Sequence, residues 1–304
     1  MPIVGRTAEL GEVDTWFAGS NHARAALLVI QGQAGIGKTS IWSEAASRAS
    51  QAGWQVLSCR SGASDAALAY VGLTDLLSVI PDDVLRTLPE PQRRPLAIAL
   101  LREAAAGELD FRAVSTGLAA LLVRLAQAAP LLLAVDDVQW LDQASATSLA
   151  FALRRAVDHQ VRMLVSARLH GPSGQRPRVL TDIEAALGRA ACTSISVGPL
   201  SVASLHRVLR TQLGSSFARP MLTRIHQAAD GNPFYALEIA RELQRVGPPP
   251  PGHPLPVPAD HTELALLRVR RLPRQTRQAL AMMASMPTSG LGEGAAMSGR
   301  HRIR

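Results

Sequence analysis

Lysine is nearly absent from this chain of 304 residues, in which Lys38 is the single lysine among many arginines. Cysteine is also scarce, since only Cys59 and Cys192 are present. Neither these cysteines nor the dispersed histidines have the spacing of a zinc site. No apolar run approaches the ~18 residues that a membrane-spanning helix needs, and the acidic residues near the amino terminus do not fit a signal peptide. These absences predict a cytoplasmic protein without a zinc centre or a membrane anchor.

The composition is otherwise that of a folded protein. Hydrophobic residues make up 47% of the chain and charged residues 18%, so a sizeable core can be buried, and the length allows one large domain and a smaller one. The formal net charge of +8 would suit a nucleic-acid partner, but the arginines are spread through every segment. A bias of composition toward arginine therefore explains the charge better than a nucleic-acid-binding stripe does.

A glycine-rich segment at 32–40 follows a short apolar run and precedes residues that favour helix. It matches the P-loop pattern G-x-x-x-x-G-K-T. Its amide groups and the dipole of the following helix favour a bound anion. We expect Lys38 to contact the β- and γ-phosphates and the Thr39 hydroxyl to ligate Mg²⁺. The predicted nucleotide-binding residues of this loop are Gly32, Gln33, Ala34, Gly35, Ile36, Gly37, Lys38, Thr39 and Ser40.

Two acidic residues, Asp136 and Asp137, follow the apolar run 131–135. Strands alternate with helices along the chain, which predicts a parallel α/β sheet whose ligands lie at the carboxyl ends of its strands. We therefore expect Asp136, with Thr39, to hold Mg²⁺, and Asp137 to orient or deprotonate the attacking water. Arg168 ends the next strand and is predicted to contact the γ-phosphate. Asp137 and Arg168 are thus the candidate catalytic residues.

The nature of the nucleotide follows from two missing motifs. Guanine-specific enzymes read the base with N-K-x-D, which needs a second lysine, and the L-S-G-G-Q signature of transporter ATPases is missing as well. The predicted cofactors are therefore ATP or ADP with Mg²⁺.

Helical periodicity predicts several further elements. Helices are expected over 8–17, capped by Thr7, and over 71–79, 91–106 and 112–128. Asp142 is expected to cap a helix that starts at 143. The other predicted helices cover 39–51, 179–188, 201–213, 218–229 and 234–245, and the predicted strands cover 27–31, 54–59, 131–135, 161–166 and 193–197. The Gly-, Pro- and Ser-rich segment 170–178 is expected to be a mobile surface loop.

Five segments together resemble the signal-transduction ATPases with numerous domains (STAND) within the AAA+ class. The chain looks most similar to the ATPase part of the large ATP-binding LuxR-type transcriptional regulators. The segments that carry this resemblance are VGR at 4–6, GQAGIGKTS at 32–40, LLLAVDDVQWLD at 131–142, SAR at 166–168 and GNPFYALEI at 231–239.

The resemblance implies a P-loop NTPase fold with a five-stranded parallel sheet of order 5-1-4-3-2, a helical lid, and the start of a winged-helix domain. It also implies that Val4, Gly5 and Arg6 line the nucleotide pocket and that Pro233 of the lid approaches the adenine. In that strand order, Cys59 and Cys192 would lie on opposite edge strands, about 19 Å apart, and so would not form a disulfide.

The predicted organisation has five parts. They are an ATPase domain at 1–199, a lid at 200–246, a proline-rich linker at 247–258, a helical hairpin at 259–286 that begins a truncated winged helix, and a disordered tail at 287–304. The family's C-terminal helical repeats and helix-turn-helix are not seen, so direct DNA binding is not expected.

The favoured hypothesis is a slowly hydrolysing ATP-dependent switch that self-associates or binds a protein partner in its ATP state. Two other hypotheses remain open. One is a small-molecule phosphotransferase that uses Arg168 and the loop 170–178, and the other is a nucleic-acid-associated AAA+ ATPase, suggested by the arginines between 268 and 277.

Overall fold

The computed structural model describes residues 3–19, 25–105, 107–168, 176–214 and 216–247, together with positions 249, 250, 253, 255 and 276. The chain divides into two compact units, Met1–Val246 and Gly247–Arg304. Apart from Gly247 and the isolated positions just named, the predicted linker, helical hairpin and tail lie outside the described residues, as does most of the predicted loop 170–178.

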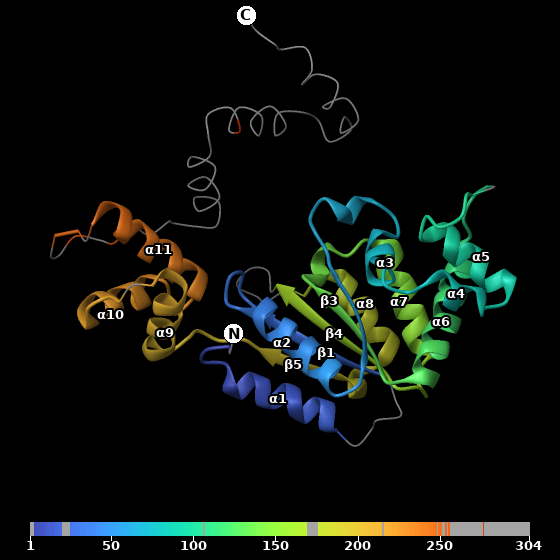
Figure 1. Ribbon diagram of the computed structural model, residues 1–304, viewed down its shortest axis with the longest axis horizontal. Helices are drawn as coiled ribbons and strands as arrows, with labels where there is room; N and C mark the ends of the chain where they lie inside the picture. Colours follow the sequence, from blue (N-terminus) through green and yellow to red (C-terminus); the bar gives the residue numbers. More distant parts are fainter. Residues whose placement is uncertain are drawn as a thin grey trace, which may run out of the picture. The chain divides into compact units, whose positions relative to one another are not determined.

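A five-stranded parallel sheet forms the centre of the first unit (Figure 1). Its strands are β1 (Ala26–Gly32), β2 (Gln55–Arg60), β3 (Leu131–Asp136), β4 (Val161–Arg168) and β5 (Cys192–Ser196). The spatial order β2-β3-β4-β1-β5 confirms the predicted strand order and fold class. As that order implies, Cys59 and Cys192 lie on the two edge strands, and both are free thiols.

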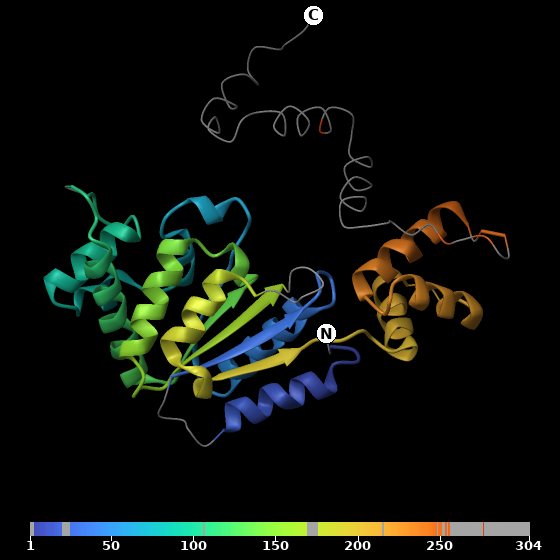
Figure 2. The ribbon, with the colours of Figure 1, turned by 180° about the vertical axis from the view of Figure 1, so that it is seen from behind.

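Helices cover both faces of the sheet, as the two opposite views show (Figures 1 and 2). Successive side chains of β1 point to opposite faces, so that Leu27 and Val29 join one hydrophobic core and Leu28 and Ile30 join the other. The second core is closed by α1 (Thr7–Ala18) and α2 (Lys38–Gln51). The first is closed by α6 (Phe111–Ala128), α7 (Gln143–Arg155) and α8 (Arg178–Leu187), with shorter helices between β2 and β3.

The shorter helices differ most from the sequence predictions. They are the 3₁₀ turn η1 (Asp65–Ala67), α3 (Val71–Leu76), α4 (Asp82–Arg86) and α5 (Glu90–Ala99). The helix predicted over 91–106 was too long, and α4 was not predicted. Helix α5 ends because Leu101 adopts a left-handed backbone, φ 57°. The Arg102 amide then donates to the Ala97 carbonyl at 2.8 Å, a Schellman ending that usually has glycine in place of Leu101.

The predicted helix caps had mixed outcomes. The prediction for Thr7 was wrong, because α1 begins at Thr7 itself, Arg6 is the N-cap residue, and no side chain caps the helix. The prediction for Asp142 is confirmed, because its carboxylate accepts the Ser145 amide at 2.8 Å. The same carboxylate accepts hydrogen bonds from the backbone amides of Tyr70 and Gly72, which holds the start of α3 against the start of α7.

Three further helices follow the sheet and form the segment that we call the lid, residues 200–246. They are α9 (Val202–Leu213), α10 (Arg219–Ala228) and α11 (Pro233–Val246). Asn232 caps α11 by accepting the Phe234 amide at 3.1 Å, and Pro233 occupies the first helical position, where its missing N–H is not needed.

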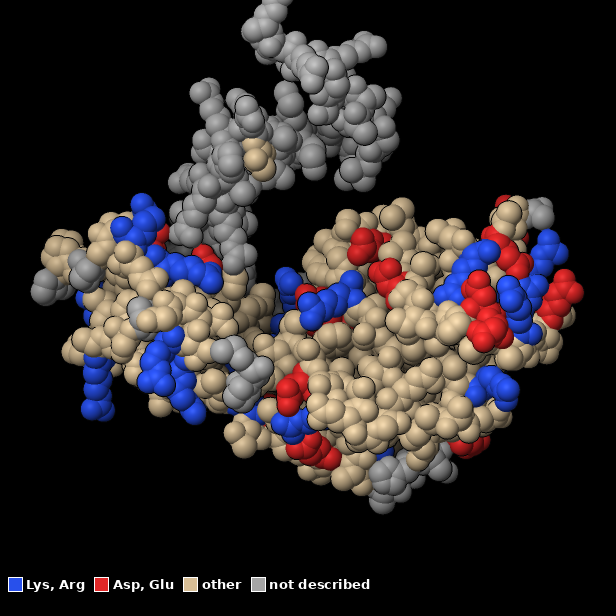
Figure 3. Space-filling view, viewed as in Figure 1, with Lys and Arg blue, Asp and Glu red and all other residues tan. Residues whose placement is uncertain are grey.

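Basic side chains on the face seen in Figure 3 occur in separate groups, among them one over the lid, one near the centre of the view and one over the helices around α5. Around α5 they are interleaved with acidic side chains. This distribution is in keeping with scattered arginines rather than one continuous basic stripe. Within the described residues, no helix combines the length and the apolar character that crossing a membrane would require.

Candidate nucleotide-binding site

The glycine-rich loop lies between the end of β1 at Gly32 and the start of α2 at Lys38. Two of its glycines take backbone angles that side chains disfavour, with φ of 76° at Gly35 and 105° at Gly37. A Cβ atom on Gly35 would lie 2.6 Å from the Cβ of Phe234 in the lid. Glycine at this position therefore allows both the turn of the loop and the close approach of α11.

Lys38 is buried in this loop, with 5% of its surface exposed. Its Nζ donates to the carbonyls of Gly32 at 3.1 Å and Gln33 at 2.9 Å. Burial lowers the pKa of the Lys38 ammonium. The negative charge of Asp137 raises this pKa, and the positive charge of Arg168 lowers it further. The ammonium group is thus held at the loop by two weak acceptors, which phosphate oxygens can replace.

Asp136 lies at the end of β3, beside the start of α2. Its Oδ1 atom accepts hydrogen bonds from the hydroxyls of Thr39, at 3.3 Å, and Ser166. Ser166 is fully buried, and its Oγ also accepts a hydrogen bond from the backbone amide of Asp137 at 2.8 Å. A carboxylate and a hydroxyl supply the hard oxygen atoms that Mg²⁺ prefers. Thr39 and Asp136 therefore fit the predicted metal site, and Ser166 orients the carboxylate.

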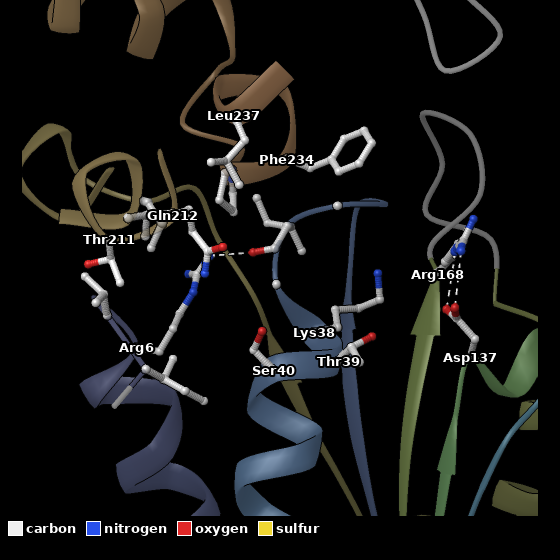
Figure 4. A pocket seen from close by; sticks show the side chains of 18 residues that line it. Arg6, Lys38, Thr39, Ser40, Asp137, Arg168, Thr211, Gln212, Phe234 and Leu237 are labelled. Atoms are coloured by element: carbon white, nitrogen blue, oxygen red, sulfur yellow. Dashed lines mark hydrogen bonds and ion pairs between the residues drawn. The ribbon is translucent and has the colours of Figure 1, made fainter. Parts of the chain in front are cut away.

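Asp137 and Arg168 form an ion pair across the ends of β3 and β4 (Figure 4). Arg168 donates from Nε to Oδ1 at 3.3 Å and from Nη2 to Oδ2 at 3.2 Å. Gln139 donates to Oδ1 at 2.8 Å and accepts the Arg168 amide at 3.1 Å. Burial alone would raise the pKa of Asp137, but Arg168 and Gln139 outweigh it, so the pKa falls below its ordinary value of 3.8.

Arg6 connects the amino-terminal segment to the loop. Its guanidinium donates to the Ile36 carbonyl at 2.7 Å, to the Gly198 carbonyl at 2.8 Å and to Glu9 at 2.8 Å. Gly5, with φ 72°, packs so closely on α9 that a Cβ would lie 2.4 Å from the Ser204 hydroxyl. The segment 4–6 thus fixes the loop against the start of the lid.

The lid contacts the loop directly. The side-chain amide of Asn232 donates to the Ala34 carbonyl at 3.0 Å while its oxygen caps α11. The Leu200 amide donates to the Gly231 carbonyl at 2.9 Å. This bond holds the turn that precedes Asn232 beside the first residue of the lid. The loop and the first turn of α11 are therefore joined through one side chain, Asn232.

A cavity of about 470 Å³ lies between the loop, the amino-terminal segment and the lid. The predicted site residues that line it are Val4, Arg6, Gly35, Ile36, Gly37, Lys38, Thr39, Ser40, Asp137, Arg168 and Pro233. The other predicted residues, Gly5, Gly32, Gln33, Ala34 and Asp136, lie beside the cavity without lining it.

Sequence reasoning missed Ser166 and seven lining residues: Ile3, Leu200, Val208, Thr211, Gln212, Phe234 and Leu237. Val208, Thr211 and Gln212 recur at the spacing of one helical face, which was the available signal, although no motif marks it. Figure 4 shows that Thr211 and Gln212 come from a different side of the cavity than Lys38 and Arg168 do.

A glycine-rich loop between a strand and a helix, with a carboxylate at the end of a neighbouring strand, defines a P-loop nucleotide-binding fold. Residues 2–165, more than half of the chain, match the family model of the AAA ATPase domain, and the chain belongs to this family. Membership implies nucleotide binding, usually with Mg²⁺. No curated protein matches the sequence.

Several solved structures match the chain at low sequence identity. A STAND protein with a tetratricopeptide repeat sensor from Pyrococcus horikoshii is 16% identical over 93% of this chain and 34% of that one, with a TM-score of 0.48. The ORC1 protein of Aeropyrum pernix, in complex with DNA, is 16% identical over 97% and 77%, with a TM-score of 0.43. AMPPCP-bound DnaA from Aquifex aeolicus is 14% identical over 93% and 68%, with a TM-score of 0.41. The chain thus spans about a third of the length of the first of these.

Proposed function

We propose that this chain is an ATP-dependent switch domain of the STAND type, similar to the ATPase part of LuxR-type transcriptional regulators. It binds ATP with Mg²⁺, hydrolyses it slowly, and in its ATP state associates with a second copy or a protein partner. The observation that carries this proposal is the hydrogen bond from Asn232 of the lid to the Ala34 carbonyl of the loop, 3.0 Å. Through this bond, the occupancy of the loop and the position of the lid depend on each other.

In this proposal the loop residues 32–40 hold the phosphates and Lys38 turns its ammonium from the loop carbonyls to the phosphate oxygens. Thr39 and Asp136 hold Mg²⁺, which when bound neutralises charge on the β- and γ-phosphates. Val4 and Pro233 also line the cavity, and in this proposal they contact the adenine.

Slow hydrolysis follows from the state of Asp137. Both of its carboxylate oxygens accept hydrogen bonds, from Arg168 and Gln139, and its pKa is lowered. A carboxylate held in this way is a poor base for water. We propose that Arg168 leaves Asp137 for the γ-phosphate, which would free the carboxylate and stabilise the transferred charge in the same movement.

Nucleotide binding is tested with Lys38→Ala. Wild-type protein should carry or bind ADP and ATP, and the variant should bind about 10- to 100-fold more weakly, because it loses charged hydrogen bonds to phosphate. Arg48→Ala is the matched control, since Arg48 lies on the same helix and pairs with Asp14 on the surface. Calorimetry and chromatography of the released nucleotide give the measurement. Absence of nucleotide affinity in the wild type would end the proposal.

The switch itself is tested by amide hydrogen exchange in α9 to α11. Exchange should differ between the ADP state and the state with a non-hydrolysable ATP analogue, and Asn232→Ala should remove most of that difference while leaving binding within a few-fold. Light scattering in the two states measures self-association. If an added small-molecule acceptor instead raised ADP release far above the rate with ATP alone, a phosphotransferase would be favoured over a switch.

A further inference from the structure

Each of the two acidic residues at the end of β3 lies near an arginine from a neighbouring strand. On one side, Arg168 of β4 pairs with Asp137 through two hydrogen bonds. On the other side, Arg60 of β2 is the register partner of Asp136. Its Nε lies 3.9 Å from Asp136 Oδ2, a longer and weaker contact. Arg60 was not among the residues that the sequence predicted for the site.

The two oxygens of Asp136 have different surroundings. Oδ1 accepts from the hydroxyls of Thr39 and Ser166, whereas the contact found for Oδ2 among the described residues is the ion pair with Arg60. A divalent cation that approaches Asp136 finds its negative charge least engaged at Oδ2. Arg60 therefore occupies the side of the carboxylate where a metal ion, or a water bound to it, would lie.

In the same conformation Arg60 also lies near a second group, the indole ring of Trp42. Its side chain is 67% exposed, and its guanidinium carbon lies 5.7 Å from the ring centroid of Trp42. Trp42 belongs to α2, one turn after Lys38, and is itself buried. A guanidinium within about 6 Å of an indole face is attracted to it. The guanidinium therefore contacts both groups at once, and it keeps the indole as a partner when its contact with the carboxylate is lost.

We propose that Arg60 is the resident counter-ion of the metal-binding carboxylate: it neutralises Asp136 until Mg²⁺ arrives with the nucleotide, and then keeps only its contact with Trp42. This inference rests on the proposed nucleotide site. Its consequence is that Mg²⁺ competes with a cation of the protein itself, so Arg60 weakens metal binding rather than assisting it. Because the pair is exposed and long, the effect is modest, about two- to fivefold in the metal concentration at half-saturation.

The experiment uses Mn²⁺ as the probe, since the free ion has an electron paramagnetic resonance signal that falls on binding. The full chain is titrated without nucleotide and with saturating ADP, as wild type, Arg60→Ala, Arg60→Lys and Arg48→Ala. Asp136→Asn identifies the signal that belongs to this site. Circular dichroism checks that each variant is folded.

Arg60→Ala should bind Mn²⁺ about two- to fivefold more tightly than the wild type, and the gain should shrink as KCl is raised, because salt screens an exposed pair. Arg60→Lys, which keeps the charge, and Arg48→Ala should resemble the wild type. Equal or weaker binding by Arg60→Ala, or no Asp136-dependent binding in any variant, would overturn the inference. If the shift occurs without nucleotide but ADP does not bind, the proposed function fails and the role of Arg60 stands. If ADP binds but Arg60→Ala does not change the affinity for Mn²⁺, the proposed nucleotide site stands and the role of Arg60 is overturned.

Discussion

Strand β4 carries an arginine near each end, and the two lie in opposite surroundings. Arg162, at the amino end, is 3% exposed and lies between the rings of Trp16 and Trp54, at 4.9 and 5.2 Å from their centroids. It donates to the backbone carbonyls of Trp16 and Gly19. Arg168, at the carboxyl end, has 39% of its side chain exposed and pairs with the carboxylate of Asp137.

The partners explain the difference between the two arginines. Backbone carbonyls and tryptophan rings are fixed by the fold, so Arg162 has one position, and burial lowers its pKa. The partner of Arg168 is a half-buried side chain beside an open cavity, and a phosphate can replace it. The same residue type on one strand thus ties α1 to the sheet at one end and is available for exchange at the other.

The largest expected effect is on the rate of ATP hydrolysis, and it comes from Asp137, the partner of Arg168 at the carboxyl end of β4. Asp137→Asn keeps the shape of the side chain and its neighbour Gln139, but removes the charge that Arg168 binds and the base that we assign to water activation. ATP hydrolysis should fall about 10²- to 10⁴-fold, while ATP affinity changes little. Steady-state hydrolysis and equilibrium binding measure the two effects separately.

The matched control is Asp14→Asn, which removes an exposed carboxylate that pairs with Arg48 on the surface. It should leave both hydrolysis and binding unchanged. If Asp137→Asn hydrolysed ATP at the wild-type rate, the Asp137–Arg168 pair would have only a structural role, as Arg162 does at the amino end of β4.

The second effect concerns folding at the amino end. Arg162→Met keeps an apolar stem but loses the donors to two carbonyls and the contacts with two indole rings. The free energy of unfolding should fall by about 2–4 kcal/mol, whereas Arg168→Met should change it by less than about 1 kcal/mol. Urea denaturation followed by circular dichroism gives both values.

Arg155→Met serves as the control for that comparison, because Arg155 is exposed and also stacks on an aromatic ring, 3.5 Å from the centroid of Phe151. If Arg155→Met lowers the free energy of unfolding only slightly, the larger loss in Arg162→Met comes from burial and from the carbonyl partners rather than from ring stacking. Equal losses for Arg162 and Arg168 would remove the distinction between the two ends.

The sequence predicted those parts of the site whose signal is local. The spacing of Gly37, Lys38 and Thr39 follows from the geometry of one loop, and the acidic pair was found because it ends a continuous apolar run. The strand order came from resemblance, and the structure confirms it. The metal and catalytic roles of these residues stay predictions.

Two of the parts that were missed depend on contacts between distant segments, and a third is local. Ser166 is a serine inside an apolar strand, and only the pairing of β4 with β3 brings its hydroxyl to Asp136. Arg60 reaches the same carboxylate through the β2–β3 register. Leu101 ends α5 in a conformation that normally belongs to glycine, so no sequence signal marked that boundary. Strand pairing thus positions Ser166 and Arg60, whereas the ending at Leu101 is closed by local backbone hydrogen bonds.

The smallest expected effect is the pH dependence of the Asp137–Arg168 pair. Because the pKa of Asp137 is lower in the folded protein than its ordinary value of 3.8, folding favours the carboxylate. Its contribution to stability is complete above the unfolded pKa and is lost as the pH falls through the lower folded pKa. The pair is partly exposed, so the loss between about pH 5 and pH 2 should stay below about 1 kcal/mol. Urea unfolding of wild type and Asp137→Asn over this range measures it. The free energies of unfolding of wild type and Asp137→Asn should converge toward low pH. The curve of Arg162→Met should stay parallel to that of the wild type, because Arg162 does not titrate in this range. If the Arg162→Met curve also converged with the wild type, an acid-sensitive contact would lie at the amino end of β4.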